Sequence, residues 1–132
     1  MPVWISALHF TLLLALFIGL SIWSRFRRLG SPWFNVACWC AIMATIMNGT
    51  AVLSNGGKMP AYLPASILPF VTVDSRHTLA TASTHFAFLC DRFYFVRWNV
   101  CASLGDMMVV CMFLCLSLGV GNLIYKQITK EE

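Results

Sequence analysis

Three histidines are the side chains best suited to ligate a metal or transfer a proton, and their positions give little support for a site. His9 lies in an apolar run, whereas His77 and His85 lie eight residues apart in a more polar stretch. A histidine in an apolar helix can bind a haem or a chlorophyll magnesium. We therefore keep His9 as a candidate cofactor ligand, although hydrogen bonding to water or a carbonyl is the more common role.

The other reactive side chains match no catalytic or metal-binding motif. Four residues could be gathered into a metal site: His77, His85, Asp91 and Asp106. No Cys-x-x-Cys or His-Glu-x-x-His spacing supports one, and phosphate-loop, dinucleotide and serine-nucleophile motifs are absent from the sequence. We expect no enzymatic activity, no metal centre and no required cofactor, while contact with a pigment or lipid stays open.

Six cysteines do not by themselves indicate a disulfide scaffold. Four fall inside apolar runs, where cysteine behaves as a small hydrophobic residue: Cys38, Cys40, Cys111 and Cys115. Cys90 and Cys101 lie in the middle of the chain and could pair in an oxidising compartment. Nothing in their spacing requires a pair, so both states stay open.

The composition shows which kind of element must carry these residues. The chain has 132 residues, 59% of them hydrophobic and 11% charged, and its mean hydropathy is +0.76. A soluble domain has about 25% charged residues and a disordered chain has low hydrophobicity, so both classes are excluded. The net charge of +4 comes from scattered residues and indicates no nucleic-acid partner. We expect a single membrane domain over residues 1–132.

Three apolar segments are long enough to cross a bilayer. A spanning helix needs about 20 mostly apolar residues, and the candidates are residues 4–23, 33–53 and 106–125. The expected fold is all-α, with three transmembrane helices and a long, partly structured loop over 54–105 on the outer face. Basic residues favour the cytoplasmic side and follow the first and third spans: Arg25, Arg27, Arg28, Lys126 and Lys130. The amino terminus is therefore expected outside and the carboxyl terminus in the cytoplasm.

Small or polar residues recur every three or four positions in each span, which places them on one helical face. The sets are Thr11, Ala15 and Gly19; Ala41, Thr45, Asn48 and Val52; and Cys111, Cys115 and Gly119. Such faces let helix backbones approach closely in lipid, so we expect them to pack the bundle, and contact with another protein is the alternative. Asn48 is expected to hydrogen-bond between helices.

The third span begins with a capping pattern, and the loop before it is rich in aromatic residues. Ser103 is expected to be the N-cap, with Asp106 closing a capping box at the positive end of the helix dipole. Six aromatic residues crowd the loop: Phe86, Phe88, Phe93, Tyr94, Phe95 and Trp98. Exposed rings in this number mark a membrane or partner surface. We expect the loop to lie along the outer interface or under another subunit.

The turn Asn55-Gly56-Gly57-Lys58-Met59-Pro60, directly after the second span, resembles a family of small bacterial integral membrane proteins classed as a domain of unknown function. The other matching elements are Asn48, His77, Leu89-Cys90-Asp91 and Ser103-Leu104-Gly105-Asp106, so the resemblance covers about residues 48–120. The sequence departs from the family pattern at Cys90, where glycine is expected, and has a shorter amino-terminal part. The resemblance implies a bacterial cytoplasmic (inner) membrane protein and carries no activity.

The matching residues also have physical roles. Asn55, Gly56 and Gly57 can adopt positive φ angles and reverse the chain at the membrane surface. Four charged residues are expected to form ion pairs that fix the loop over the outer end of the bundle: Asp91, Arg92, Arg97 and Asp106.

We expect a noncatalytic accessory or structural subunit that packs against other integral membrane subunits, for example in an electron-transfer or photosynthetic assembly. The alternative is a membrane protein that binds a small ligand or metal through the loop. The candidate structural and interaction residues are Asn48, Asn55, Gly56, Gly57, Lys58, Pro60, Asp91, Arg92, Trp98, Ser103, Gly105 and Asp106.

Overall fold

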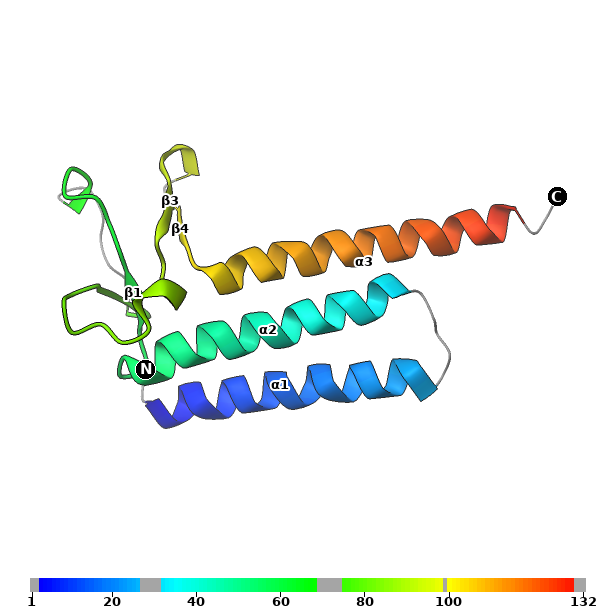
Figure 1. Ribbon diagram of the computed structural model, residues 1–132, viewed down its shortest axis with the longest axis horizontal. Coiled ribbons are helices and arrows are strands. Elements are labelled where there is room, and N and C mark those ends of the chain that lie inside the picture. The colour runs from blue at the N-terminus through cyan, green and yellow to red at the C-terminus, as the bar shows by residue number, and fades with distance from the viewer. Residues whose placement is uncertain (1–2, 27–31, 69–74, 99, 130–132) are drawn as a thin grey trace.

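Three long helices dominate the computed structural model, which describes residues 3–26, 32–68, 75–98 and 100–129 (Figure 1). They are α1 (Val3–Phe26), α2 (Pro32–Ser54) and α3 (Leu104–Ile128), and α2 lies between the other two. Their apolar stretches have mean hydropathies of 2.2, 1.7 and 2.3, and each helix is long enough to span a membrane. The three predicted spans are confirmed in length and composition, and the fold is that of a mostly helical integral membrane protein.

Helix α2 forms the core of the bundle because its side chains are small. Half of its apolar stretch is buried within the protein, against 11% for α1 and 6% for α3. At Gly49 the backbone comes so close to α1 that an added Cβ would lie 3.2 Å from Cγ of Phe10. Small residues permit such approaches in lipid, so the outer helices pack on α2 and leave most of their own surface to the surroundings.

The predicted packing faces are right for α2 and wrong for α1. Ala41 and Thr45 of α2 are buried. All three residues predicted on the α1 face are exposed: Thr11, Ala15 and Gly19. Helix α1 instead buries Ser6 and Ser21. The small residue Gly49 of α2 leaves room for the larger Phe10 side chain of α1, and the small residues that α1 buries are these two serines. In α3, Gly119 is buried and Cys111 is exposed.

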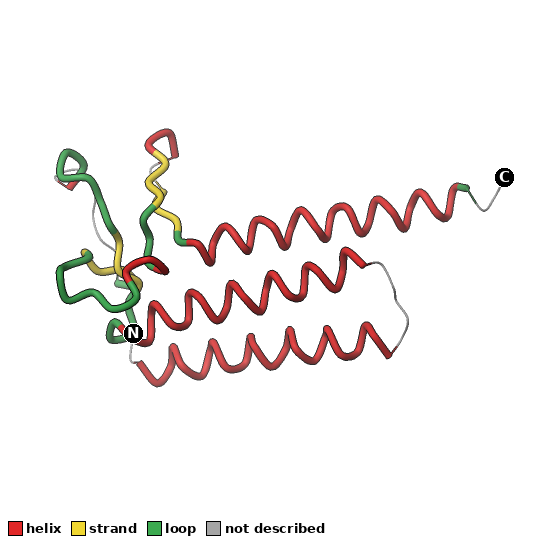
Figure 2. The backbone as a smooth tube through the Cα atoms, viewed as in Figure 1, coloured by secondary structure: helices red, strands yellow, loops and turns green. Residues whose placement is uncertain are grey.

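Short elements fill the segment between α2 and α3 (Figure 2). Strand β1 (Met59–Ala61) pairs in parallel with β2 (His77–Leu79), and Met59 lies opposite His77. The 3₁₀ turn η2 (Ala87–Leu89) follows. Strand β3 (Phe93–Phe95), the turn η3 (Val96–Trp98) and strand β4 (Val100–Ala102) then form an antiparallel hairpin that leads into α3.

These short elements pack on the end of α2 through a small second core. Its buried members are Ala51, Met59, Leu89 and Cys90. Cys90 is fully buried, so a small apolar side chain fills this core. The loop end of the bundle also holds the start of α1, whereas α3 ends at the opposite end (Figure 1).

Part of the basis for the predicted orientation lies outside the described residues. This holds for Arg27, Arg28 and Lys130, and the side chain of Arg25, in the last turn of α1, is not described either. Lys126 lies in the last turn of α3. The orientation therefore stays a prediction.

Candidate functional site

The Asn-Gly-Gly turn ends α2, and the predicted positive φ angles are found at its two glycines but not at its asparagine. Gly56 and Gly57 have φ angles of 72° and 84°. The Gly57 N–H donates to the Val52 carbonyl at 2.9 Å, which is the long bond of a Schellman helix end. Asn55 is not among the described residues with positive φ. Glycine meets the backbone requirement at lower cost, which leaves the Asn55 side chain for another role.

That role is to hold a distant loop against the end of α2. The Asn55 Nδ2 atom donates to the Ala51 carbonyl at 2.8 Å and to the His85 carbonyl at 2.9 Å. In return, the His85 N–H donates to Asn55 Oδ1 at 3.0 Å. The amide thus pairs with the His85 backbone as a neighbouring strand would. Two other predicted residues of this turn differ in burial: Lys58 is exposed, whereas Pro60 in β1 is fully buried.

A polar contact joins α2 to the start of α3, and the predicted capping box is confirmed. The Ser103 N–H donates to Asp106 Oδ2 at 2.9 Å, and the Asp106 N–H donates to Ser103 Oγ at 3.1 Å. Asn48 joins this box from α2: its Nδ2 donates to Asp106 Oδ1 at 3.0 Å, and its Oδ1 accepts from Ser103 Oγ at 2.8 Å. A Cβ on Gly105 would overlap the Asn48 amide, so glycine is required there.

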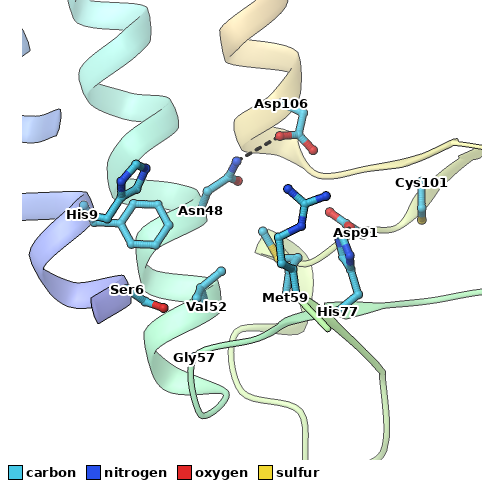
Figure 3. A pocket seen from close by; sticks show the side chains of 12 residues that line it. Ser6, His9, Asn48, Val52, Gly57, Met59, His77, Asp91, Cys101 and Asp106 are labelled. Atoms are coloured by element: carbon cyan, nitrogen blue, oxygen red, sulfur yellow. Dashed lines mark hydrogen bonds and ion pairs between the residues drawn. The ribbon is translucent and has the colours of Figure 1, made fainter. Parts of the chain in front are cut away.

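Beside this contact lies a cavity of about 530 Å³ (Figure 3). Side chains from all three helices and from the loop surround it, and polar groups face apolar ones. The lining residues are Ser6, His9, Phe10, Asn48, Val52, Gly57, Met59, Arg76, His77, Asp91, Cys101 and Asp106. The structure therefore gathers Asn48, His77 and both predicted aspartates around one space.

Asp91 is the most unusual group in this cavity because its carboxyl group is almost entirely buried, with 4% of the side chain exposed. Its backbone is fixed by bonds to the Pro60 carbonyl and the Tyr62 N–H, at 3.0 and 2.8 Å. Burial, and secondarily the nearby charge of Asp106, raises the pKa of Asp91 to about 6, while His77 acts in the opposite direction. The His77 Nε2 atom lies 3.4 Å from Asp91 Oδ2.

The predicted ion-pair network takes a different form in the structure. Asp91 faces His77, which was expected beside it as a possible metal ligand and not as an ion-pair partner. Arg92 lies over the ring of Tyr62, with 5.2 Å between its guanidinium carbon and the ring centroid. Trp98 is exposed and packs its ring 6.0 Å from that of Phe95. Arg92 and Trp98 therefore lie away from the cavity lining.

The residues considered for metal or cofactor binding are only partly brought together. His85 is exposed and does not line the cavity. Among the described residues, no group of three or more His, Cys, Asp and Glu side chains is placed to hold a metal ion. His9 does line the cavity, and its ring contacts Phe10 edge to face at 5.8 Å.

The two loop cysteines are unpaired in the structure, as are the other four. The Cys90 thiol points toward the Phe86 carbonyl at 3.5 Å, inside the second core. Cys101 instead faces the cavity, where burial, followed by the charge of Asp91, raises its pKa to about 11. Its thiol is therefore neutral near pH 7 and is a poor nucleophile.

Several lining residues were missed by sequence reasoning: Ser6, Phe10, Met59, Arg76 and Cys101. They come from separate segments that only the tertiary fold brings together. One available signal was the spacing of Ser6 and His9, which places both on one face of α1.

Three membrane-length helices with a polar cavity at one end define an integral membrane protein. The chain belongs to a family of unknown function, DUF5317, whose model matches residues 1–118. This match includes α1, which the resemblance over residues 48–120 did not reach. No curated protein and no solved structure matches the chain. The function must therefore be argued from the cavity.

Proposed function

We propose that this chain is a noncatalytic membrane protein that binds a small polar ligand in the cavity at the loop end of its bundle. The cavity itself is the observation that carries the proposal. Its volume of about 530 Å³ falls in the usual range for small-molecule sites, about 300–1,000 Å³. Its lining is more polar than that of most such sites, which favours a polar ligand. A buried carboxyl group with a raised pKa is also typical of functional sites.

The lining groups offer a ligand both signs of charge. Asp91 and Asp106 supply acceptors, and Arg76 supplies donors. Phe10, Val52 and Met59 provide apolar wall. A ligand with both a charged group and a short apolar part fits this lining better than a purely apolar molecule.

The polar groups are held in place before any ligand arrives. Bonds from Asn48 and the Ser103 backbone fix the Asp106 carboxylate. Hydrogen bonds at the N–H and at the carbonyl of Asp91 fix its backbone. Such preorganisation lowers the entropy lost on binding. With the amino terminus outside, as the basic residues predict, the cavity would take its ligand from the extracytoplasmic side of a bacterial inner membrane.

The proposal is tested by thermal unfolding of the protein in lipid nanodiscs with a panel of amino acids, organic acids and amines. A ligand present at 100 times its Kd stabilises the folded state by about 2.7 kcal/mol, which raises Tm measurably. Asp91→Asn and Asp106→Asn should reduce the shift. Ser117→Ala, a change at an exposed position of α3, should leave it intact. If no compound shifts Tm, or if both aspartate variants respond as the wild type does, the proposal is wrong.

A second candidate function is that of a subunit in a larger membrane complex. It is favoured by the exposed rings of Phe86 and Phe88, whose centroids lie 6.5 Å apart. Phe86 is, among the described residues, the one non-glycine residue with positive φ, at 50°. Such backbone conformations cost about 1–3 kcal/mol and cluster at functional sites. The Asn55 side chain holds the backbone of His85, the residue directly before Phe86, by two hydrogen bonds.

Purification from native membranes in mild detergent distinguishes the second candidate. A subunit should co-purify with the same membrane proteins in repeated preparations, and Phe86→Ser with Phe88→Ser should release them. Recovery of the wild type as a free monomer alone would remove this candidate.

A further inference from the structure

We infer that the β3–β4 hairpin is a lipid-binding element that lies in the headgroup layer beside α3. The surface concerned consists of exposed apolar residues of the hairpin and its turn: Phe93, Phe95, Val96, Trp98 and Val100. We call this surface the aromatic face. The inference does not depend on a ligand in the cavity.

The pairing of the strands separates the aromatic face from the cavity. Tyr94 lies opposite Cys101, and Phe95 lies opposite Val100. Because side chains alternate between the two faces of a strand, Phe95 and Val100 share one face, and Tyr94 and Cys101 share the other. Cys101 lines the cavity. Phe95 and Val100 are therefore turned away from the cavity, and on their face only Ala102, opposite Phe93 at the base of the hairpin, is buried.

The turn enlarges the same surface. Val96 and Trp98 are 76% and 69% exposed, the largest values among the hairpin's hydrophobic residues. The Trp98 ring packs 6.0 Å from that of Phe95, which joins the turn to the strand face. Exposed apolar groups this close together mark a contact surface and are not usual on a face that meets water.

The position of the hairpin brings this surface to the membrane. Strand β4 ends at Ala102, one residue before the N-cap of α3, so the hairpin begins at the level where the third span starts. Figure 1 shows the two strands running across the direction of the helix axes, away from α2. A hairpin with this direction lies along the bilayer surface, over the lipids that surround α3.

The chemistry of the segment agrees with the headgroup layer as its environment. Residues 92–102 contain two arginines, Arg92 and Arg97, and no acidic residue. Tryptophan and tyrosine favour the interface, and basic side chains favour anionic headgroups. Within the described residues, β3 and β4 form a two-stranded sheet of their own. Backbone groups on the outer edges of such a sheet need hydrogen-bond partners, which the hydrocarbon interior cannot supply. The hairpin therefore stops at the headgroups.

Fluorescence quenching of Trp98 tests this position. Trp4, Trp23, Trp33 and Trp39 are replaced by phenylalanine, and the protein is placed as a single copy in nanodiscs of neutral and anionic phospholipid. We expect lipids brominated near the headgroup to quench Trp98 about twofold more than lipids brominated near the chain ends, as befits a depth of about 5–10 Å. Acrylamide in the water should quench it weakly.

Two controls keep the result interpretable. A protein that keeps Trp39 alone, which is exposed within α2, should show stronger quenching by the deep bromines. If the four-residue variant does not fold, the difference between the wild type and Trp98→Phe reports the same quenching. Strong quenching of Trp98 by acrylamide in the single-copy nanodisc would overturn the inference. Protection that appears only when other membrane proteins are present would overturn it as well and would assign the aromatic face to a protein partner.

Discussion

Asp91 is an ionisable residue whose side chain is almost entirely buried, and this combination is expected to make the stability of the protein depend on pH. In the folded state the pKa is about 6, against a usual value of 3.8. The folded protein thus binds this proton more tightly than the unfolded chain does. Linkage requires the resulting stabilisation to be complete below the usual pKa and to be lost as the pH rises toward the folded value.

We therefore expect the Tm of the wild type to fall between about pH 4 and pH 6, by an amount equivalent to about 1–3 kcal/mol at about 1.4 kcal/mol per unit of pKa. Asp91→Asn should remove this fall because asparagine does not titrate. Thermal unfolding of the two proteins in the same detergent measures both curves. Parallel pH profiles for the two proteins would contradict the assignment.

Two neighbouring residues, Asp106 and His77, should change the pH at which Asp91 titrates. Infrared spectroscopy follows the carbonyl band of the protonated carboxyl group, which Asp91→Asn should abolish. Because Asp106 raises this pKa and His77 lowers it, Asp106→Asn should move the titration to lower pH. His77→Gln should move it to higher pH.

The contact between α2 and the start of α3 depends on several residues that fit one another. It combines a capping box, an asparagine from the neighbouring helix and a glycine that makes room for that asparagine. An amide buried between helices stabilises only if its donors and acceptors are paired. At Asn48 one donor and the acceptor are paired with Asp106 and Ser103.

Gly105→Ala should therefore destabilise the protein by about 1–3 kcal/mol, because the new methyl group displaces the Asn48 side chain and breaks its bonds. Gly121→Ala, in the same helix, is the matched control, since a Cβ there meets nothing within 4 Å. Thermal unfolding compares the two. In an Asn48→Ala background, Gly105→Ala should cost less than in the wild type. Equal effects at both glycines would show that the close contact does not form.

The hydrogen bonds of Asn55, at the end of α2, can be tested by a single substitution. Asn55→Ala should speed hydrogen exchange of the His85 amide, because its acceptor is lost. The Thr84 amide is an internal control, since it donates to the Thr81 carbonyl within its own turn. Amide exchange followed by NMR measures both. Unchanged protection of His85 in the variant would exclude the role given to Asn55.

The whole molecule has its loop and the start of α1 at one end and the end of α3 at the other, as three crossings require (Figure 1). The basic residues after the first and third spans predict that the loop end faces outward. A fluorescent protein that matures only in the cytoplasm should then be bright when fused after α3 and dark when fused before α1. A phosphatase that is active only outside should give the reverse pattern. If the fluorescent and phosphatase signals are exchanged between the two fusion sites, the loop end faces the cytoplasm.

The sequence predicted the features that depend on neighbouring residues. The apolar runs predicted three helices within a few residues of their observed ends, and the Ser103–Asp106 spacing predicted the capping box. The inward face of α1 was not predictable from small residues, because a helix in lipid is apolar on every side and small residues occur on the lipid side too. The grouping of His77, Asp91 and Asp106 was anticipated as a possible site. The cavity's other walls and the pairing of His77 with Asp91 were not, because three-residue strands and long-range pairings leave no periodic pattern.

The Asn48 contact has a consequence for how the chain is made. The two partners of this amide, Ser103 and Asp106, lie 55 and 58 residues further along the chain. At a synthesis rate of about 5–20 residues per second, the ribosome reaches them roughly 3–12 seconds after Asn48. During that interval α2 can enter the membrane, but its amide lacks its final partners. The second helix therefore completes its polar contacts only when the third one arrives, and a chain truncated before α3 would leave the Asn48 amide without these two partners.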